Sequence, residues 1–557
     1  MATRRAGIAV VVLSAAGLLA LPVVSAYSEP ASEEAPDPSA AEQVSAAQRQ
    51  GEEPMPLLEL VSAGGSGRLY TLDQREAQNA AENHGMDLQS GRVGYFPRGG
   101  ADGTTPLYRL KPASDSTAWL FTVSEAERDS LIDDGWVFEG TAGHVYTDAA
   151  PDREVLNRLS NGREWRLALK SETDELVEAG YTLDGPVGYV YPQWIRTGAV
   201  YFGMFNIDGH QRIIQRTEEV YGREGDWWGG VRDFRDGTEY ATDNWPDQDW
   251  SDLKPSIGYY DDSDPHTLEQ HITQATSAGL SFFSFYWYWN TEAQEPSVTD
   301  ASLDAFLQAE NRDAMDFTVS LCAHPFGELD VPTDQYDQVA SLMVEKYLSQ
   351  DNTLRANDGR KIFNICDARG LGDGSPEQVG DFVETVRSEA DEQLGEDIYV
   401  QINQAGFAQS DVPAAGADSS YCTTDGPGVE SRSYQSYLDG MLDYFNSGPA
   451  AASYSRCLMS DFDERPRYPI ENTDASTIRY FPDHSMERYR EAVSTVFDDI
   501  EDSRRPQDVD NIVYVYAWNE WHEGGYIEPN ERDGCAYLDV LTEEFRLPSD
   551  GCQARPE

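Results

Sequence analysis

Short apolar runs alternate with longer segments of helical periodicity between residues 194 and 545, and this alternation constrains the fold most. Strands and helices in alternation form parallel sheets, and eight such pairs within 194–557 predict an α/β fold, a (β/α)8 TIM barrel. A doubly wound open sheet is the alternative, but no glycine-rich phosphate loop follows the first predicted strand. The predicted strands are 199–205, 281–288, 317–323, 361–367, 398–403, 417–422, 457–461 and 512–518. Predicted helices include 267–278, 336–348, 376–394 and 486–500.

The end of the eighth predicted strand carries two carboxylates. In such a barrel the active site lies at the carboxyl ends of the strands. There the chain reads AWNEWHEG over 517–524, so that Glu520 and Glu523 are three residues apart. In a helical turn this spacing puts side chains on one face, with Cβ atoms about 5–6 Å apart. Two carboxyls at about 5–5.5 Å can perform retaining glycoside cleavage. We expect both glutamates to be catalytic, with Trp518 and Trp521 drying the site and raising the pKa of one carboxyl.

Two other interpretations of this motif stay open. Glu520 and Glu523 could simply stabilise the solvated start of a helix, where negative side chains offset the helix dipole. Alternatively, Glu520, His522, Glu523 and Glu528 could bind a metal, although residues of one turn rarely converge on an ion and the chain has no HExxH motif. We favour acid/base chemistry on a carbohydrate, and we expect no metal and no cofactor.

Three stretches of the barrel sequence resemble glycoside hydrolase family 99 and its WbsX-like relatives. They are PSIGYYD at 255–261, SFFSFYWYW at 281–289, and the strand-eight motif with IEP at 527–529. The resemblance covers about residues 200–541, in the family's order. It implies a (β/α)8 barrel that acts on α-mannose-type linkages with retention. In that scheme Glu520 deprotonates the sugar 2-hydroxyl, opening a route through a 1,2-anhydro intermediate, and Glu523 is the general acid and then the base.

Strand three departs from this pattern. WbsX-like relatives usually carry Trp-Ala-Asn-Glu there, whereas this chain has Cys322-Ala323-His324-Pro325. His324 either takes over a polar contact or caps the strand, and the sugar stays open. The expected substrate contacts, taken from strand ends and motifs, are Tyr259, Tyr286, Trp287, Trp289, His324, Asp461, Asp463, Arg465, Trp518, Asn519, His522 and Glu528.

The N-terminal residues predict export. Arg4 and Arg5 precede an apolar stretch at 8–21, and small residues end at Ala26, which predicts a signal peptide at 1–26 and a secreted, extracellular protein. The apolar stretch is short for a membrane span, and none is expected after cleavage. Residues 27–56 are rich in Glu, Ala, Ser and Pro and predict a disordered acidic linker.

Six cysteines in an exported chain permit disulfides. Cys535 with Cys552 is the first pair that we expect. Cys322 and Cys366 are either bonded or merely buried as small apolar groups.

Residues 57–193 carry a weak pattern that returns three times, with Gly85, Gly135 and Gly180 at corresponding positions. Each unit predicts a strand, a short helix, a glycine turn and a strand pair, which gives a small α+β three-repeat domain. It resembles an uncharacterised repeat family attached to secreted hydrolases. The tryptophans Trp119, Trp136 and Trp165 either bind sugars or form the core of the domain. A binding module is expected rather than a catalytic one.

The charge balance limits the partners. Against 99 Asp+Glu the chain has 41 Lys+Arg, a formal net charge of −58, which excludes a cationic face for nucleic acid. The sequence therefore predicts a secreted retaining glycosidase that acts on a mannose-containing polysaccharide or glycan. The alternatives are a non-catalytic glycan-binding or cell-surface protein, a transglycosylase, or a WbsX-type glycosyltransferase. The predicted signal peptide argues against the last, because nucleotide-sugar donors are not supplied outside the cell.

Overall fold

A computed structural model describes most of the chain from Pro54 to Pro556. The predicted signal peptide and nearly all of the predicted linker lie outside the described residues. Among the residues that are described, no helix is both long and apolar enough to span a bilayer. Within 54–556, the residues not described are 64, 66, 89–92, 98–99, 102, 114–117, 151–152, 193, 206–227, 229–230, 232–249, 251, 298, 326–327, 404–406, 423–431, 448–452, 466–477, 503–508, 510 and 550.

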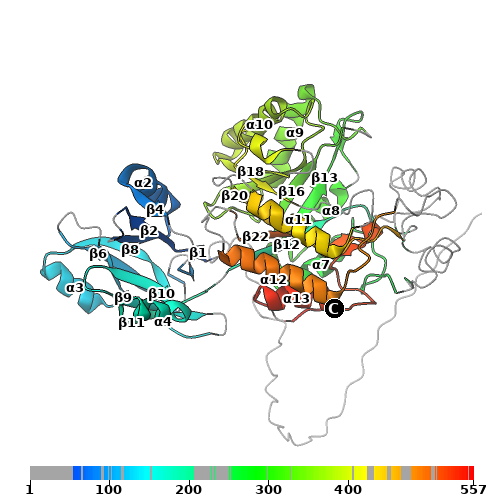
Figure 1. Cartoon of the computed structure of the whole chain (residues 1–557). Coiled ribbons are helices and arrows are strands. Elements are labelled where there is room, and N and C mark those ends of the chain that lie inside the picture. Colours follow the sequence, from blue (N-terminus) through cyan, green and yellow to red (C-terminus); the bar gives the residue numbers. More distant parts are fainter. Residues whose placement is uncertain are drawn as a thin grey trace, which may run out of the picture. The chain divides into compact units, whose positions relative to one another are not determined.

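The C-terminal domain is a closed barrel of parallel strands, as the sequence predicts (Figure 1). Its first strand pairs with the second on one side and with the eighth on the other, which closes the sheet. The seventh strand is split in two at Ser455. In order, the strands are β12 (Arg196–Tyr201), β13 (Phe282–Trp287), β16 (Asp316–Cys322), β17 (Lys361–Asp367), β18 (Ile398–Asn403), β19 (Ser419–Tyr421), β20 (Ser453–Tyr454) with β21 (Arg456–Met459), and β22 (Ile512–Tyr516).

Helices connect most of these strands and pack against the outside of the barrel. They are α7 (Pro265–Ser277), α8 (Asp300–Gln308), α9 (Tyr336–Leu342) continued by the π-helical turn η4 (Met343–Leu348), α10 (Pro376–Leu394), α11 (Tyr434–Ser447), α12 (Met486–Asp502) and α13 (Ala536–Glu544). Between β18 and β19 the described residues form only the 3-10 turn η5 (Gln409–Asp411).

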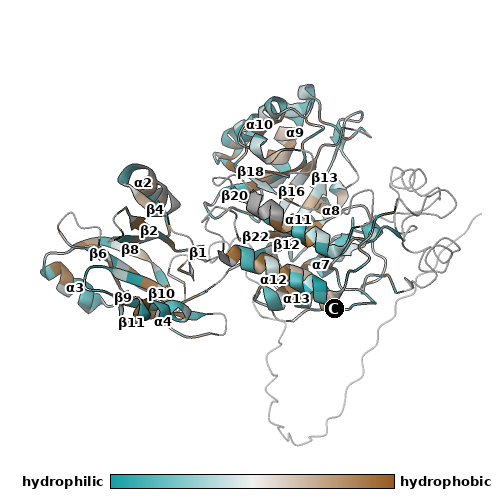
Figure 2. Cartoon of the chain, in the orientation of Figure 1, coloured by the Kyte–Doolittle hydropathy of each residue, from teal (hydrophilic) through white to brown (hydrophobic). Residues whose placement is uncertain are grey.

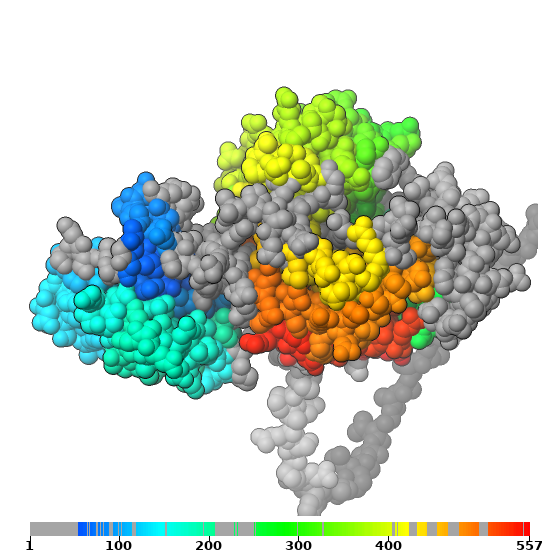
Figure 3. Space-filling model, viewed as in Figure 1, coloured from blue at the N-terminus to red at the C-terminus, as the bar shows by residue number. Residues whose placement is uncertain are grey.

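Local sequence explains where these helices begin and which face they bury. At the start of α10, Ser375 accepts a hydrogen bond from the Gln378 amide and Pro376 occupies the first turn, and left-handed Gly395 ends the helix. Helix α12 buries residues at helical spacing, and it shows both hydrophobic and hydrophilic residues in Figure 2. Helices α12 and α13 contact each other, as the orange and red surfaces in Figure 3 show.

The interior of the barrel contains a buried network of hydrogen-bonded polar side chains. The Tyr514 hydroxyl accepts a hydrogen bond from Asn364 Nδ2 at 3.1 Å and donates one to Gln401 Oε1 at 3.0 Å. Gln401 Nε2 in turn donates to Ser419 and Ser455 at 2.9 and 2.8 Å. Because every member is buried and paired, this network fixes how neighbouring strands meet beneath the active-site end.

Three disulfides join the six cysteines. Cys322–Cys366 links β16 to β17, and Cys422–Cys457 links the residue after β19 to β21. Cys535–Cys552 ties α13 to the C-terminal tail, which is the pair expected first from the sequence. The first bridge settles the open alternative at Cys322 in favour of a bond.

The N-terminal domain repeats one order of pairing three times. In each segment an opening strand pairs with the next strand and also with the strand after a helix. Left-handed Gly85, Gly135 and Gly180 each follow a helix, a conformation that glycine adopts without strain. The segments are β2 (Leu58–Ser62), β3 (Arg68–Thr71), α2 (Gln74–His84), β4 (Met86–Leu88); β6 (Thr104–Lys111), β7 (Leu120–Thr122), α3 (Glu125–Asp133), β8 (Val137–Tyr146); and β9 (Glu154–Ser160), β10 (Trp165–Leu169), α4 (Lys170–Glu178), β11 (Thr182–Val190).

The tryptophans of this domain pack within it. The Trp119 indole donates to Glu139 at 2.9 Å, and the rings of Trp136 and Trp165 meet edge to face at 5.6 Å. Met55 and Pro56, the end of the predicted linker, form β1 (Met55–Pro56) and pair with β5 (Tyr95–Phe96). The folded domain therefore starts slightly before the predicted boundary.

Candidate active site

A tight turn after β22 presents the two glutamates. Strand β23 (Asn519–Glu520) pairs antiparallel with β24 (Gly525–Tyr526), and the 3-10 turn η9 (Trp521–Glu523) joins them. Glu520 lies on β23 just before this turn and Glu523 is the last residue of the turn, and the charges of both carboxylates act on the nearby Tyr288 phenol. Gly524 closes the turn at φ 68°, and a Cβ there would lie 2.7 Å from the Asp463 amide nitrogen. Only glycine fits this contact.

Two tyrosines from the inner face of the barrel stand beside the glutamates. The Tyr516 hydroxyl donates to Glu523 Oε2 at 2.5 Å. Burial raises the pKa of Tyr288, and the negative charges of Glu520, Glu523 and Asp367 raise it further. These four carboxylate and phenol positions are therefore neighbours at one end of the barrel. Glu520 is buried, with 6% of its surface exposed, and Glu523 is more open.

The ends of strands three and four bring a histidine, an aspartate and an arginine together. His324 Nδ1 lies 2.5 Å from Asp367 Oδ2, and Arg369 grips the same carboxylate with Nε and Nη2 at 2.9 and 2.6 Å. Burial raises the pKa of Asp367, but the hydrogen bonds from His324 and Arg369 outweigh it and lower the pKa. The His324 and Tyr288 rings are 5.6 Å apart, which joins this cluster to the glutamate site.

The end of strand seven repeats that arginine geometry. Arg465 grips Asp463 through Nε at 2.7 Å and Nη2 at 2.8 Å, while the Asp463 amide donates to the Glu523 carbonyl at 2.6 Å. Asp461 Oδ2 lies 3.3 Å from His484 Nδ1. Burial and then the Asp463 charge raise the pKa of Asp461, so this carboxyl favours its protonated form.

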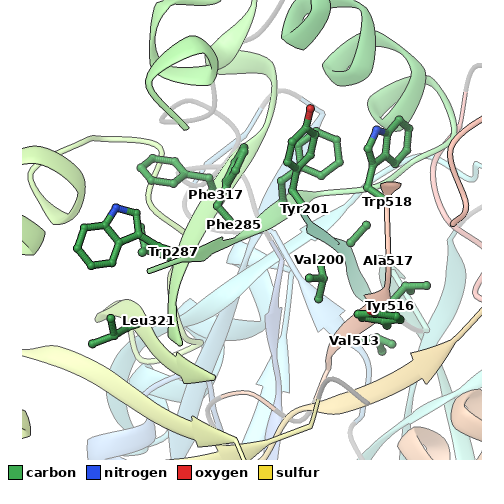
Figure 4. Close-up of a cluster of buried hydrophobic side chains, with 14 of the residues drawn as sticks. Val200, Tyr201, Phe285, Trp287, Phe317, Leu321, Val513, Tyr516, Ala517 and Trp518 are labelled. Carbon is green, nitrogen blue, oxygen red and sulfur yellow. The ribbon is translucent and has the colours of Figure 1, made fainter. Parts of the chain in front are cut away.

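Two of the expected aromatic contacts are not brought to the site. Along β13 alternate side chains point to opposite faces, so that Tyr286 points inward and Trp287 outward. Trp287 is fully buried among hydrophobic side chains (Figure 4) and donates to Asp300 at 2.7 Å. Trp289 is also fully buried and donates to Gln335 at 2.6 Å. Both rings belong to the barrel wall.

Four more expected contacts pack around the turn η9 and its neighbouring strands. Asn519 accepts from the Phe202 amide at 2.8 Å and donates to its carbonyl at 3.0 Å, which ties strand eight to strand one. Glu528 is fully buried and accepts from Tyr260 at 2.9 Å and from Trp521 at 3.0 Å. These groups support the turn instead of facing a ligand. The other two, Trp518 and His522, are buried with their rings against Phe283 and Phe205 respectively.

The expectation that Trp518 and Trp521 dry the site therefore needs correction, because Tyr288 and Tyr516 are the rings next to the glutamates. The ring of Tyr259 lies 5.0 Å from that of Trp228.

Sequence reasoning missed Tyr288, Tyr516, Asp367 and Arg369. A signal was present for each of them. The two tyrosines sit on the inward-pointing alternation of their strands, and Asp367 is the last residue of a strand whose bounds the sequence predicts. Asp-x-Arg occurs at the ends of both strand four and strand seven, and in each the arginine folds back on the aspartate.

The arrangement supplies acid/base groups. Two carboxylates three residues apart, a phenol bonded to one of them, and an aspartate held by a histidine and an arginine can move protons and bind hydroxyl groups. Within the described ranges, no three His, Cys, Asp or Glu side chains are grouped to hold a metal ion.

Comparison with known proteins gives two partial family matches. Residues 392–541, which include both glutamates, match the family described as Glycosyltransferase WbsX. Residues 56–191 match a domain of unknown function, DUF5648. No curated protein matches the chain.

Several solved structures are similar at low identity. A GH99 endo-alpha-mannosidase from Bacteroides thetaiotaomicron is 15% identical with a TM-score of 0.42, over 64% of this chain and 98% of that one. The same enzyme with BIS-TRIS-propane gives 16% and 0.41, over 64% and 98%. An endo-beta-1,4-mannanase from Thermotoga petrophila is 11% identical with a TM-score of 0.30, over 56% and 78%.

Proposed function

We propose that this protein is a retaining glycoside hydrolase that cleaves a mannose-containing polysaccharide or glycan through Glu520 and Glu523. One observation carries the proposal: at the carboxyl end of strand eight, the carboxylates of Glu520 and Glu523 both lie near the phenols of Tyr288 and Tyr516. The WbsX match spans this turn, and the sequence resemblance to glycoside hydrolase family 99 supports the choice of mannose. Endo-α-mannosidase activity is the specific form that we propose.

The two glutamates divide the reaction between them. Glu520 takes the proton of the sugar 2-hydroxyl, whose oxygen then attacks C1, while Glu523 gives its proton to the departing glycosidic oxygen. Water next attacks C1 and gives a proton to Glu523, while the C1–O2 bond formed in the first step breaks with its electron pair on the 2-oxygen, which recovers its proton from Glu520. Each carboxyl returns to its starting state, so the pair is catalytic in the strict sense.

The surrounding side chains suit a polar sugar. Tyr286 and Tyr288 offer aromatic faces, and His324 and Arg465 offer polar groups at the ends of strands three and seven. Asp461 and Asp463 complete the proposed contacts. The three disulfides fit an oxidising compartment, which supports an extracellular location for the enzyme.

Transfer to a sugar acceptor is the second candidate, because the matching family is described as a glycosyltransferase. A nucleotide-sugar donor is disfavoured in an oxidising, extracellular setting, since such donors are made inside cells. Transglycosylation needs no such donor, and it would appear as products longer than the donor when acceptor sugar is abundant.

The test is release of reducing ends from a panel of α-mannans and other glycans by the chain from Tyr27 onward. We expect the parent to cleave at least one mannose-containing glycan, and both Glu520→Gln and Glu523→Gln to lose more than about 1000-fold in kcat. Glu345→Gln is the matched control, because this glutamate is exposed on the far helix turn η4.

Full activity in Glu523→Gln would contradict the assignment of Glu523 as a catalytic residue. Tight binding of one glycan without cleavage, by parent and variants alike, would instead indicate a binding protein.

A further inference from the structure

The hydroxyl of Tyr516 is placed directly on one of the two glutamates. Tyr516 is the last residue of β22, on the inward face, and its hydroxyl donates to Glu523 Oε2 at 2.5 Å. Glu523 also holds its neighbour strand, because its carbonyl accepts the Asp463 amide. Glu523 is therefore held by two hydrogen bonds, one to its side-chain carboxylate and one to its backbone carbonyl.

The Tyr516 phenol stays protonated near neutral pH, and it therefore stays a hydrogen-bond donor. Burial raises the pKa of its phenol well above the ordinary value, and the charges of Glu523 and Glu520 raise it further. The ring is 5% exposed and packs in the barrel interior, so the hydroxyl cannot turn to water.

We propose that Tyr516 is a positioning residue that favours the first half of the reaction by stabilising the Glu523 carboxylate left after proton transfer. The inference rests on the proposed function. A phenol hydrogen bond is stronger to a carboxylate than to a carboxylic acid. The bond therefore tightens as the proton passes from Glu523 to the glycosidic oxygen and the C1–O bond breaks, with the electron pair remaining on the leaving oxygen.

The same hydrogen bond from Tyr516 to Glu523 opposes the second half of the reaction, in which water attacks C1. There Glu523 must take a proton from the attacking water, and the carboxylate that accepts it is the form that Tyr516 stabilises. Tyr516 thus shifts the balance towards cleavage of bonds with poor leaving groups. A glycan, whose leaving group is another sugar, is such a substrate.

The test compares two leaving groups in the variant Tyr516→Phe. With an oligosaccharide that the parent cleaves, we expect kcat/KM to fall about 10- to 100-fold, the range for loss of a charge-assisted hydrogen bond. With the glycosyl fluoride of the same sugar, whose leaving group needs little protonation, we expect a change of less than about threefold. KM for the oligosaccharide should change little, because the phenol does not touch the substrate.

Tyr514→Phe is the matched control. Tyr514 lies on the same strand and the same face, one layer deeper, and its buried hydroxyl bonds the amides of Asn364 and Gln401. Its loss should lower stability without any dependence on the leaving group. Tyr516→His keeps a ring with a donor N–H and should recover part of the oligosaccharide activity, which separates a lost donor from a damaged fold.

The outcomes separate this inference from the proposed function. Equal losses on both substrates, or none on either, would overturn the role of Tyr516 while inactivity of Glu523→Gln upheld the glutamates. Full activity of Glu523→Gln, or no cleavage of any glycan in the panel by the parent, would overturn both.

Discussion

At the scale of single residues, tyrosines rather than tryptophans form the immediate surroundings of the glutamates. Tyr288 and Tyr516 point inward because each falls on the inward alternation of its strand, whereas Trp287 falls on the outward one. The Tyr516 hydroxyl donates to the Glu523 carboxylate, and Tyr288 lies beside both glutamates. The sequence run of aromatics therefore contains two populations, one for the ligand side and one for the barrel wall.

This alternation explains which site residues could be predicted. Glu520 and Glu523 could be found because both lie in one short motif, next to each other in sequence. Asp367 and Arg369 come from the end of strand four, and the pairing of strands two, three and four brings Asp367 near Tyr288. Glu528 looks like a third acid in the motif, yet its bonds to Tyr260 and Trp521 hold it inside. Partner contacts of that kind leave no trace in a single sequence.

His484 gives a pH prediction at this scale. Burial lowers its pKa to about 4, although a backbone hydrogen bond at Ser460 and the charges of Asp483 and Asp463 raise it. The unfolded chain, with a histidine pKa near 6.5, binds the proton first as pH falls. Stability from neutral His484 is therefore full above pH 6.5 and decreases towards pH 4, by about 3 kcal/mol.

Urea unfolding at pH 7 and pH 4.5 measures this effect. Relative to His484→Phe, the parent should lose stability as the pH falls. An unchanged difference between the two proteins at both pH values would contradict the prediction. In the folded parent, Asp461 Oδ2 lies 3.3 Å from Nδ1 of the His484 ring, and this neighbour is the same at both pH values.

At the scale of elements, regular strands could be predicted and interruptions could not. The expected strands 361–367 and 398–403 coincide with β17 and β18, because both are continuous buried runs. The seventh strand is split at Ser455, whose hydroxyl joins the polar network of the interior. Since apolar periodicity carries no information on such a network, the expected start of this strand at 457 was late.

The turn η9 yields a second prediction. Gly524→Ala should disrupt the turn and reduce kcat more than about tenfold, because the new Cβ meets the backbone of Asp463 at 2.7 Å. Gly359→Ala is the control: Gly359 also has a positive φ, 94°, but its Cβ would meet nothing within 4 Å.

Both variants carry left-handed strain of about 1–2 kcal/mol. The difference between them therefore isolates the clash. Thermal unfolding and kcat measured on both variants test this, and equal activities would show that the turn tolerates the methyl group.

At the scale of the whole molecule, the composition predicts how the protein responds to its solution conditions, and it predicts little about the architecture. The barrel follows from the alternation of elements, but the net charge of −58 would suit many folds. Strand pairing in the N-terminal domain follows the same order in three segments, while a role of this domain in binding glycans stays a prediction.

The charge itself predicts a response to salt. So many like charges repel one another in the compact state, and salt screens that repulsion over about 10 Å at 0.1 M and 3 Å at 1 M. We expect the Tm to rise by a few degrees as NaCl increases from 0.05 to 1 M. Calorimetry at several salt concentrations measures it, with sucrose at matched osmolality as the control. A Tm that stays constant or falls with salt would show that repulsion between like charges does not limit the thermal stability of the protein.

The pairing of β12 with β22 also governs how the molecule is made. A ribosome adds about 5–20 residues each second, so the eighth strand emerges well after the first. Until it does, β12 and β21 keep unpaired edges and the barrel stays open. Glu520, Glu523 and Tyr516 all travel with that last strand. Biosynthesis thus delivers the strand that closes the barrel together with the two proposed catalytic glutamates, so that under the proposed function a partly made chain is inactive.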